Sequence, residues 1–264
     1  MKELFRKFYD FGLSSESEFL TRQKVIRTKE WDSIVHLIPE GSSFLDIGCG
    51  KGHSMSLAIN QKNCNCTGID PFPNFAGATP ELAGVEHKFS IVEGWAENLP
   101  FEDNSFDVVY SSHMLEHTSD YDKALSEMNR VVRPDGIVIM GVPTATMATI
   151  RLVSVALLST HRNIIELARW MFRTKDWQKA HPISMFIIPS SHGQPNRTIF
   201  YDLWDYQVNR WKSRLEKQLR FDQLTQPALY CYPDFISLFK LSVIKNWSSS
   251  AFFIARKKTD GQIT

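Results

Sequence analysis

The fold is decided by Leu45-Asp46-Ile47-Gly48-Cys49-Gly50-Lys51-Gly52, which continues the short apolar run Ser43–Ile47. Three glycines at i, i+2 and i+4 let the backbone turn tightly and approach a ligand closely. A helix expected through about Asn60 would offer its free N–H groups and the positive end of its dipole. The pattern also fits a tight turn without a ligand. A dinucleotide fingerprint would need a third glycine at His53, and the Lys-Ser/Thr pair of a phosphate-binding loop is absent.

Strands and helices are expected to alternate between residues 42 and 143. Short apolar runs bounded by turn residues indicate strands, and apolar residues at helical spacing indicate helices. This alternation predicts an α/β fold with a doubly wound, mostly parallel sheet of the Rossmann-like kind. The expected strands are Ser43–Ile47, Cys66–Asp70, His87–Val92, Phe106–Tyr110 and Ile137–Met140, with a helix at Tyr121–Val132 and a turn at Pro134–Gly136.

The alternation stops after Pro143. Residues 145–172 and 200–219 are expected to be helical, with a loop at 181–196 and a late strand at Ser250–Ala255. We therefore expect one domain over residues 1–264. Its parts are a core at 42–143, a helical insertion after the fifth strand at 144–235 that would cover a substrate, and a return to the sheet at 236–258.

The composition is that of an ordinary globular protein. The chain has 264 residues, 43% of them hydrophobic and 22% charged, which excludes disordered, collagen-like and disulfide-scaffold classes. Four cysteines are too few for a disulfide framework, so we expect reduced thiols and a cytoplasmic protein. No secretory signal is expected, and the longest uncharged apolar stretch, Ile137–Ile150, ends at Arg151 before the ~20 residues of a membrane span.

Charge is divided unevenly along the chain. Residues 1–150 carry 13 Lys and Arg against 21 Asp and Glu, a net charge of −8. Residues 151–264 carry 17 against 8, a net charge of +9. Such a split indicates different partners for the two halves, or an attraction between them that could also form a homodimer.

Further motifs follow the glycine turn. Asp70 ends the next strand about 20 residues later, where a carboxylate can bind ribose hydroxyls. The block Ala96–Val109 reads A-E-N-L-P-F-E-D-N-S-F-D-V-V, and Leu115-Glu116-His117 and Arg133-Pro134-Asp135-Gly136 come after it. Over residues 43–143 these motifs resemble the class I S-adenosylmethionine (SAM)-dependent methyltransferases. The Ala96–Val109 block resembles the members that methylate ubiquinone and menaquinone precursors.

The resemblance implies that SAM is the cofactor and places its contacts residue by residue. Asp46 and the turn Gly48-Cys49-Gly50 would line the methionine half, and Asp70 would bind the ribose hydroxyls. Ala96 would meet the adenine edge through its backbone. The remaining contact would be Ser111 or Ser112, near the methionine end at the close of the fourth strand.

Trp95 departs from the family pattern. The family often has an Asp at this position, which accepts a hydrogen bond from the adenine amine. An indole only donates, so Trp95 would stack on the adenine or pack against the protein instead. We therefore expect weaker binding of SAM.

Two histidines are candidate catalytic residues. His117 ends the string His113-Met114-Leu115-Glu116-His117, which also has the spacing of a zinc peptidase motif and resembles a metal-binding motif of some methyltransferases. We expect no metal here and interpret His117 as an acceptor contact or proton acceptor, or as an ordinary family signature. His192, in Pro189–Gly193, lies in a region similar to methyltransferases of bacterial surface-glycan assembly, although a turn with a solvated histidine fits equally. His181 is a third, weaker candidate.

The insertion is expected to choose the acceptor. Residues 144–235 are basic and hold four of the seven Trp, which suits an anionic, ring-bearing molecule such as a phosphorylated or lipid-linked glycan. Nucleic acid is not expected, because no dense Lys/Arg run or RNA-binding module is present. The apolar segment Leu152–Leu158, flanked by Arg151 and Arg162, would be buried or would touch a membrane surface, such as the inner face of the cell membrane.

These observations predict a SAM-dependent methyltransferase acting on a small or glycan-like acceptor, at oxygen. Two alternatives stay open at this point. One is C-methylation of a quinone or polyketide-like ring. The other is a SAM-binding scaffold without catalysis.

Overall fold

The structure is a computed structural model that describes residues 16–72, 82–158, 164, 191–194, 196–227 and 248–258. The chain divides into two compact units. The first, here the helical unit, comprises Met1–Gln23, Thr144–Tyr206 and Ala228–Ser249. The second, here the sheet unit, comprises Lys24–Pro143, Gln207–Pro227 and Ser250–Thr264. The expected organisation as one domain stays a prediction.

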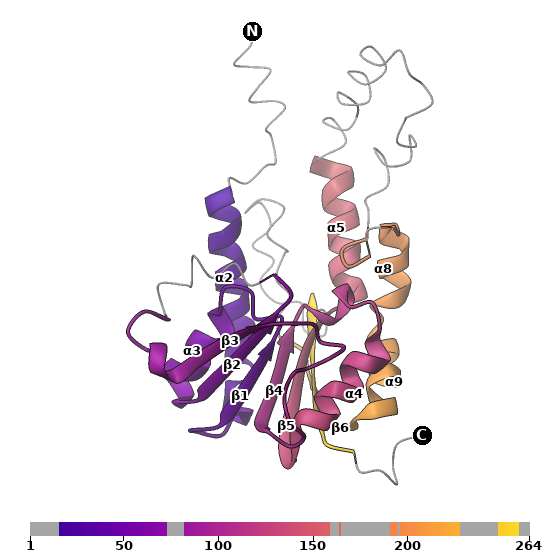
Figure 1. The fold of residues 1–264 in the computed structure, drawn as a ribbon. Helices are drawn as coiled ribbons and strands as arrows, with labels where there is room; N and C mark the ends of the chain where they lie inside the picture. The colour runs from indigo at the N-terminus through magenta and orange to yellow at the C-terminus, as the bar shows by residue number, and fades with distance from the viewer. Residues whose placement is uncertain are drawn as a thin grey trace, which may run out of the picture. The chain divides into compact units, whose positions relative to one another are not determined.

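The sheet unit is built on seven strands in the order β3-β2-β1-β4-β5-β7-β6 (Figure 1). Its first five strands are parallel, and the last two are antiparallel to their neighbours. This confirms the doubly wound, mostly parallel α/β sheet. The strands are β1 (Ser43–Ile47), β2 (Asn65–Asp70), β3 (Phe89–Glu93), β4 (Phe106–Ser112), β5 (Val132–Pro143), β6 (Arg220–Thr225) and β7 (Ser250–Arg256).

Side chains of alternate strand residues point to opposite faces of the sheet, so each face needs its own cover. On one face, helices α2 (Glu16–Asp32) and α3 (His53–Lys62) contribute Trp31 and Met55 to a core cluster. The Trp31 ring lies edge-on to Tyr110 of β4, with ring centroids 5.7 Å apart. Burial of these large side chains is the main stabilisation of this layer.

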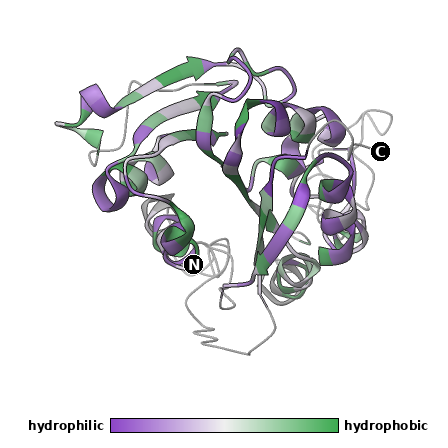
Figure 2. Cartoon of the chain, turned by 90° about the horizontal axis from the view of Figure 1, so that it is seen from below, coloured by the Kyte–Doolittle hydropathy of each residue, from purple (hydrophilic) through white to green (hydrophobic). Residues whose placement is uncertain are grey.

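The other face of the sheet is covered by α4 (Tyr121–Val131) and α9 (Val208–Gln218). Leu125 of α4 and Trp211 of α9 meet Phe253 of β7 there. The Trp211 indole N–H also donates to the carbonyl of Pro143, 3.1 Å away. Figure 2 shows the hydrophobic residues along the strands, as expected for a sheet buried on both faces.

The guanidinium of Arg130 binds several residues of the Ala96–Val109 block. Arg130 of α4 donates to the carbonyl oxygens of Leu99 and Phe101, at 2.9 and 2.7 Å. It also pairs with Glu127 at 2.7 Å and with Asp103 at 2.8 Å. These bonds hold the loop before β4 against α4, so part of this family motif has a structural role.

Three expected elements differ from the observed ones. Arg220–Thr225 was expected within the helical insertion at 144–235, but it is strand β6, so the sheet resumes before residue 236. Pro134–Gly136 was expected as a turn, but it belongs to β5 and lies where the register against β4 shifts. The helix expected at 200–219 is two helices, because the extended backbone of Gln207 (ψ 133°) separates α9 from α8 (Ile199–Asp205).

The helical unit contains α5 (Ala145–Leu158), α8 and the first part of α2. Helices α5 and α8 are joined at the start of α5, where the Ala145 N–H donates to the carbonyl of Tyr206 at 2.9 Å. Among the helices that the structure describes, none combines the length and apolar character needed to cross a membrane. Residues 159–163 and 165–172 of the expected long helix lie outside the described residues.

We expect Arg130→Ala to lower the free energy of unfolding by about 1.5–3 kcal/mol, because charge-assisted hydrogen bonds to Leu99 and Phe101 are lost. Urea denaturation of both proteins measures this. Arg256→Ala is the matched control, because Arg256 pairs with Asp222 on the surface and its loss should cost less than about 1 kcal/mol. Equal losses in the two variants would contradict the role given to Arg130.

Candidate functional site

A cavity of about 470 Å³ opens at the carboxyl ends of β1, β2, β3 and β4. This edge is where open parallel sheets bind ligands, and the volume is typical of small-molecule sites. The residues that line the cavity are Ile47, Gly48, Ile69, Asp70, Pro71, Phe72, Gly94, Trp95, Ala96, Glu97, His113, Met114, His117, Thr118 and Ser119.

The turn after β1 brings backbone to the cavity. Gly48 has a positive φ of 76°, and its N–H donates to the carbonyl of Ile69 at 2.8 Å. A Cβ at Gly48 would lie 2.5 Å from Cγ of Met114 and 2.8 Å from its Cβ. Only glycine therefore fits between β1 and the residue that follows β4.

Asp70 is fixed by the same turn. Its Oδ2 accepts the N–H of Gly50 at 3.0 Å, and its Oδ1 accepts the N–H of Phe72 at 2.9 Å. Each carboxylate oxygen keeps a further lone pair for a ligand hydroxyl. A Cβ placed at Gly50 would meet nothing within 4 Å, so the space above the turn is open.

Asp46 lies beneath the turn and is buried. Its Oδ2 is buried without a hydrogen-bond partner among the described residues. Burial, and then the nearby charge of Asp70, raise the pKa of Asp46 to about 8. A positively charged ligand group near this carboxyl would stabilise its ionised form.

Trp95 and Phe72 form part of the cavity wall with exposed aromatic faces. The two side chains are 55% and 82% exposed. Trp95 therefore does not pack in the core. Ala96, next to it, is buried and lines the cavity.

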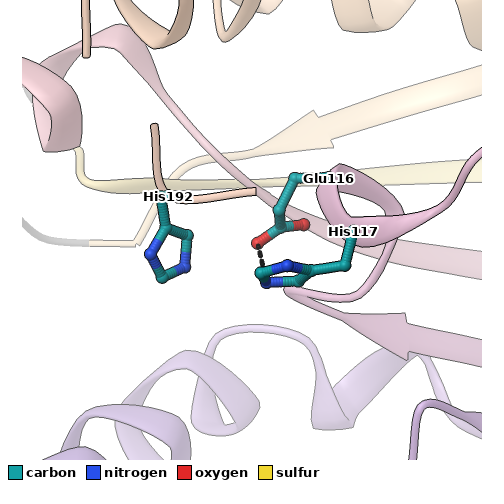
Figure 3. Close-up of side chains that lie close together, drawn as sticks. All are labelled: Glu116, His117 and His192. Atoms are coloured by element: carbon teal, nitrogen blue, oxygen red, sulfur yellow. Dashed lines mark ion pairs between the residues drawn. The ribbon is translucent and has the colours of Figure 1, made fainter. Parts of the chain in front are cut away.

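The opposite wall follows β4. His113 lines the cavity with its side chain almost wholly buried, and the single turn η5 (Leu115–His117) comes after it. Glu116 is fully buried, and its Oε1 lies 4.0 Å from Nε2 of His117, the ion pair drawn in Figure 3. His117 is about half exposed and lines the cavity, so its imidazole can reach a ligand.

Comparison with known proteins identifies this region. The family described as "Methyltransferase domain" matches residues 45–140. A demethylmenaquinone methyltransferase of Staphylococcus aureus is 38% identical over 105 residues, which cover 39% of this chain and 43% of the relative. Residues 45–140 therefore match a methyltransferase domain and resemble the class I SAM-dependent enzymes.

Solved structures extend the similarity of fold over most of the chain. A SAM-dependent methyltransferase from Thermotoga maritima has a TM-score of 0.54 at 19% identity, covering 92% of this chain and 94% of that one. A methyltransferase of Haloferax volcanii, solved with the Trm112 methyltransferase activator, has a TM-score of 0.57 at 14% identity, covering 90% and 95%. These likenesses show the fold. The curated relatives match over less than half of their own length.

SAM is the cofactor of this family, and the residues of the methyltransferase domain fit it. Asp70 offers carboxylate oxygens to hydroxyls at the cavity, and Trp95 offers an aromatic face to a base. The unpartnered Oδ2 of Asp46 and the open space at Gly50 suit a cationic molecule that lies on the turn.

The predicted site residues fall into two groups. Gly48, Asp70, Trp95, Ala96 and His117 line the cavity. The rest do not line it: Asp46 lies beneath the turn, Gly50 binds Asp70, Cys49 packs on Gly68, and Ser111 and Ser112 lie at the end of β4.

Sequence reasoning missed Phe72 and Met114 as cavity residues. Each follows a strand end by two residues, Phe72 after Asp70 and Met114 after Ser112. That position on a parallel sheet is the signal that could have found them.

His192 belongs to the helical unit, where a buried carboxylate anchors its loop. The backbone N–H of His192 donates to Oδ2 of Asp202 at 2.8 Å, and the Ser191 hydroxyl donates to Oδ1 of the same residue. The Gly193 N–H donates to the Tyr206 hydroxyl at 3.1 Å. The loop that carries His192 is thus held through its backbone. His181 lies outside the described residues.

Gly48→Ala should destabilise the domain and weaken SAM binding, because the new Cβ collides with Met114. Gly41→Ala is the matched control, since Gly41 has a similar φ of 73° but open space around it. We expect a loss of about 1–2 kcal/mol in Gly41→Ala from backbone strain alone. In Gly48→Ala a further ~1–3 kcal/mol should come from overpacking. Chemical denaturation and calorimetric titration with SAM measure both effects, and matching losses would refute the close approach.

Asp46 should make stability depend on pH. Its folded pKa of about 8 lies above the ordinary value of 3.8, so the folded state holds an extra proton between these two values. The free energy of unfolding should therefore fall as pH rises from about 4 to about 8, and then level off. In Asp46→Asn the decline between pH 4 and 6 should be absent, whereas Asp122→Asn, at an exposed residue paired with Lys217, should keep it. Urea denaturation at several pH values provides the measurement.

Proposed function

We propose that this chain transfers the methyl group of SAM to an oxygen atom of a small-molecule acceptor. The supporting observation is the span of the cavity along the sheet edge. Asp70 ends β2 and Trp95 follows β3, whereas His117 follows β4, and β1 lies between β2 and β4 in the sheet order. One cavity thus offers a cofactor side and, across the glycine turn, a side for the acceptor.

On the cofactor side, we propose that Asp70 binds the ribose hydroxyls and that Trp95 stacks on the adenine. Asp46, Gly48 and Gly50 would hold the methionine half. Bound SAM supplies a methyl group that its sulfonium already activates, so the protein needs chiefly to orient the reacting atoms.

On the acceptor side, we propose that His117 takes the proton of the acceptor hydroxyl. Its imidazole lines the cavity, and the buried carboxylate of Glu116 lies beside it.

Exposed side chains of the helical unit favour a ring-bearing, anionic acceptor. Phe200 and Trp204, one helical turn apart on α8, are 54% and 52% exposed. The Arg197 guanidinium lies over the Tyr201 ring, 5.4 Å from its centroid. Exposed aromatic and basic side chains together suit sugars that carry phosphate, which keeps a phosphorylated or lipid-linked glycan as the proposed acceptor class. His192 would contact it, and a lipid-linked form would bring the chain to a membrane surface.

A quinone-type ring is the second candidate acceptor. The relative named demethylmenaquinone methyltransferase is 38% identical to this chain over 105 residues. The exposed aromatic faces of Trp95 and Phe72 would also accept a flat ring. Methyl transfer would then occur at carbon.

A first experiment tests cofactor binding. Calorimetric titration with SAM should show binding to the wild-type chain. Asp70→Ala should weaken it by about 1–3 kcal/mol, the scale of hydrogen bonds to a charged group. Asp122→Ala should bind as the wild type does. A wild-type chain that binds neither SAM nor S-adenosylhomocysteine would refute the proposed function.

A second experiment tests the acceptor class. SAM with a radioactive methyl group is incubated with a panel of phosphorylated glycans, lipid-linked glycans and demethylated quinones. Label in the glycans supports the first candidate, and label in the quinones supports the second. Tight SAM binding without turnover of any acceptor would favour a scaffold that binds SAM.

A further inference from the structure

His113 has an unusual backbone at the cavity wall. Its φ is +52°, in the left-handed region. The other described non-glycine residues with positive φ are Asn63 and Asn104, and this region is uncommon for any residue other than glycine. Strained residues of this kind persist only where their surroundings fix them, and they gather at functional sites.

Two buried carboxylates fix the His113 side chain. Its Nε2 lies 3.5 Å from Oε1 of Glu30, and its Nδ1 lies 3.5 Å from Oε1 of Glu116. Nε2 also bonds to the Ser250 hydroxyl at 3.0 Å, and that hydroxyl bonds to Glu30. We call Glu30, His113, Glu116 and Ser250 the clamp. The clamp joins α2, the turn after β4 and the first residue of β7.

The charges of the clamp alternate. Arg27 pairs with Glu30 at 2.7 Å, His113 lies between Glu30 and Glu116, and Glu116 lies beside His117. Burial would raise the pKa of Glu30, but Arg27 and His113 lower it to about 2. Burial and Arg27 act to lower the pKa of His113, yet Glu30 and Glu116 raise it above its ordinary value. Burial would likewise raise the pKa of Glu116, but the hydrogen bond and charge of His113 lower it below its ordinary value.

We propose that His113, clamped between Glu30 and Glu116, is the positioning residue of the cavity wall. It holds the left-handed backbone that sets Met114 against Gly48 and places His117 of η5 at the cavity. His113 acts through these neighbours and takes no part in the chemistry itself. The inference rests on the proposed function, because SAM is the ligand that reports on the shape of the cavity.

The test compares His113→Asn with the wild type at pH 6 and pH 9. Asparagine tolerates the left-handed backbone but cannot carry the charge of an imidazolium. We expect SAM to bind His113→Asn at least tenfold more weakly at pH 6. The difference should shrink at pH 9, because the stabilisation by a raised histidine pKa is full below about 6.5 and is lost as pH rises through the folded value. His87→Asn, at an exposed histidine away from the cavity, should bind within twofold of the wild type at both pH values.

The pH dependence of unfolding is the second readout, and it needs no ligand. The loss of unfolding free energy in His113→Asn should be larger at pH 6 than at pH 9. If the wild type binds no SAM, the proposed function fails, and this readout still judges the clamp. SAM binding within twofold of the wild type, or a loss that does not change with pH, would overturn the inference.

A milder variant covers the case in which His113→Asn does not fold. Ser250→Ala keeps the imidazole and both carboxylates but removes the hydroxyl that bridges His113 and Glu30. It should weaken SAM binding about threefold at pH 6. Unchanged binding in a folded Ser250→Ala protein would overturn the proposal.

Discussion

The carboxyl edge of the sheet depends on the close approach of the Gly48 backbone to Met114. Any side chain at position 48 would lie within 2.8 Å of two carbons of Met114. The turn after β1 therefore packs against the turn after β4 only if position 48 is glycine and the backbone at Met114 is held in place. Asp70 depends on the first turn through the Gly50 N–H, and His117 depends on the second.

Buried charge accumulates around these two turns. Asp46 lies beneath the first, and Glu30, His113 and Glu116 lie behind the second. Burying charged groups lowers the stability of the fold unless each group is paired, and well-packed apolar side chains would lower it less. The pairs behind the second turn use residues from three separate parts of the chain, which restrict the wall to one arrangement. The site thus gives up some stability for a defined shape, as functional sites commonly do.

Sequence alone predicted the features that rest on local signals. The glycine turn, the five parallel strands and the carboxylate at the end of β2 follow from short-range patterns. The contact between Glu30 and Ser250 joins residues 220 positions apart, so no local sequence pattern predicts it. Strand β6 was missed for a related reason. Most of its side chains are exposed at the sheet edge, so it lacks the apolar run that marks β5.

The motifs that identify the family say more about the cofactor than about the acceptor. Arg130 binds the loop of the Ala96–Val109 block, so that block positions Trp95 and Ala96 at the cavity through bonds internal to the domain. The family match ends at residue 140, before α5 begins. Beyond it, Asp202 builds a separate network that holds the loop of His192. A relative that matches residues 45–140 therefore shares these motifs, whereas the loop of His192 is held by contacts of its own.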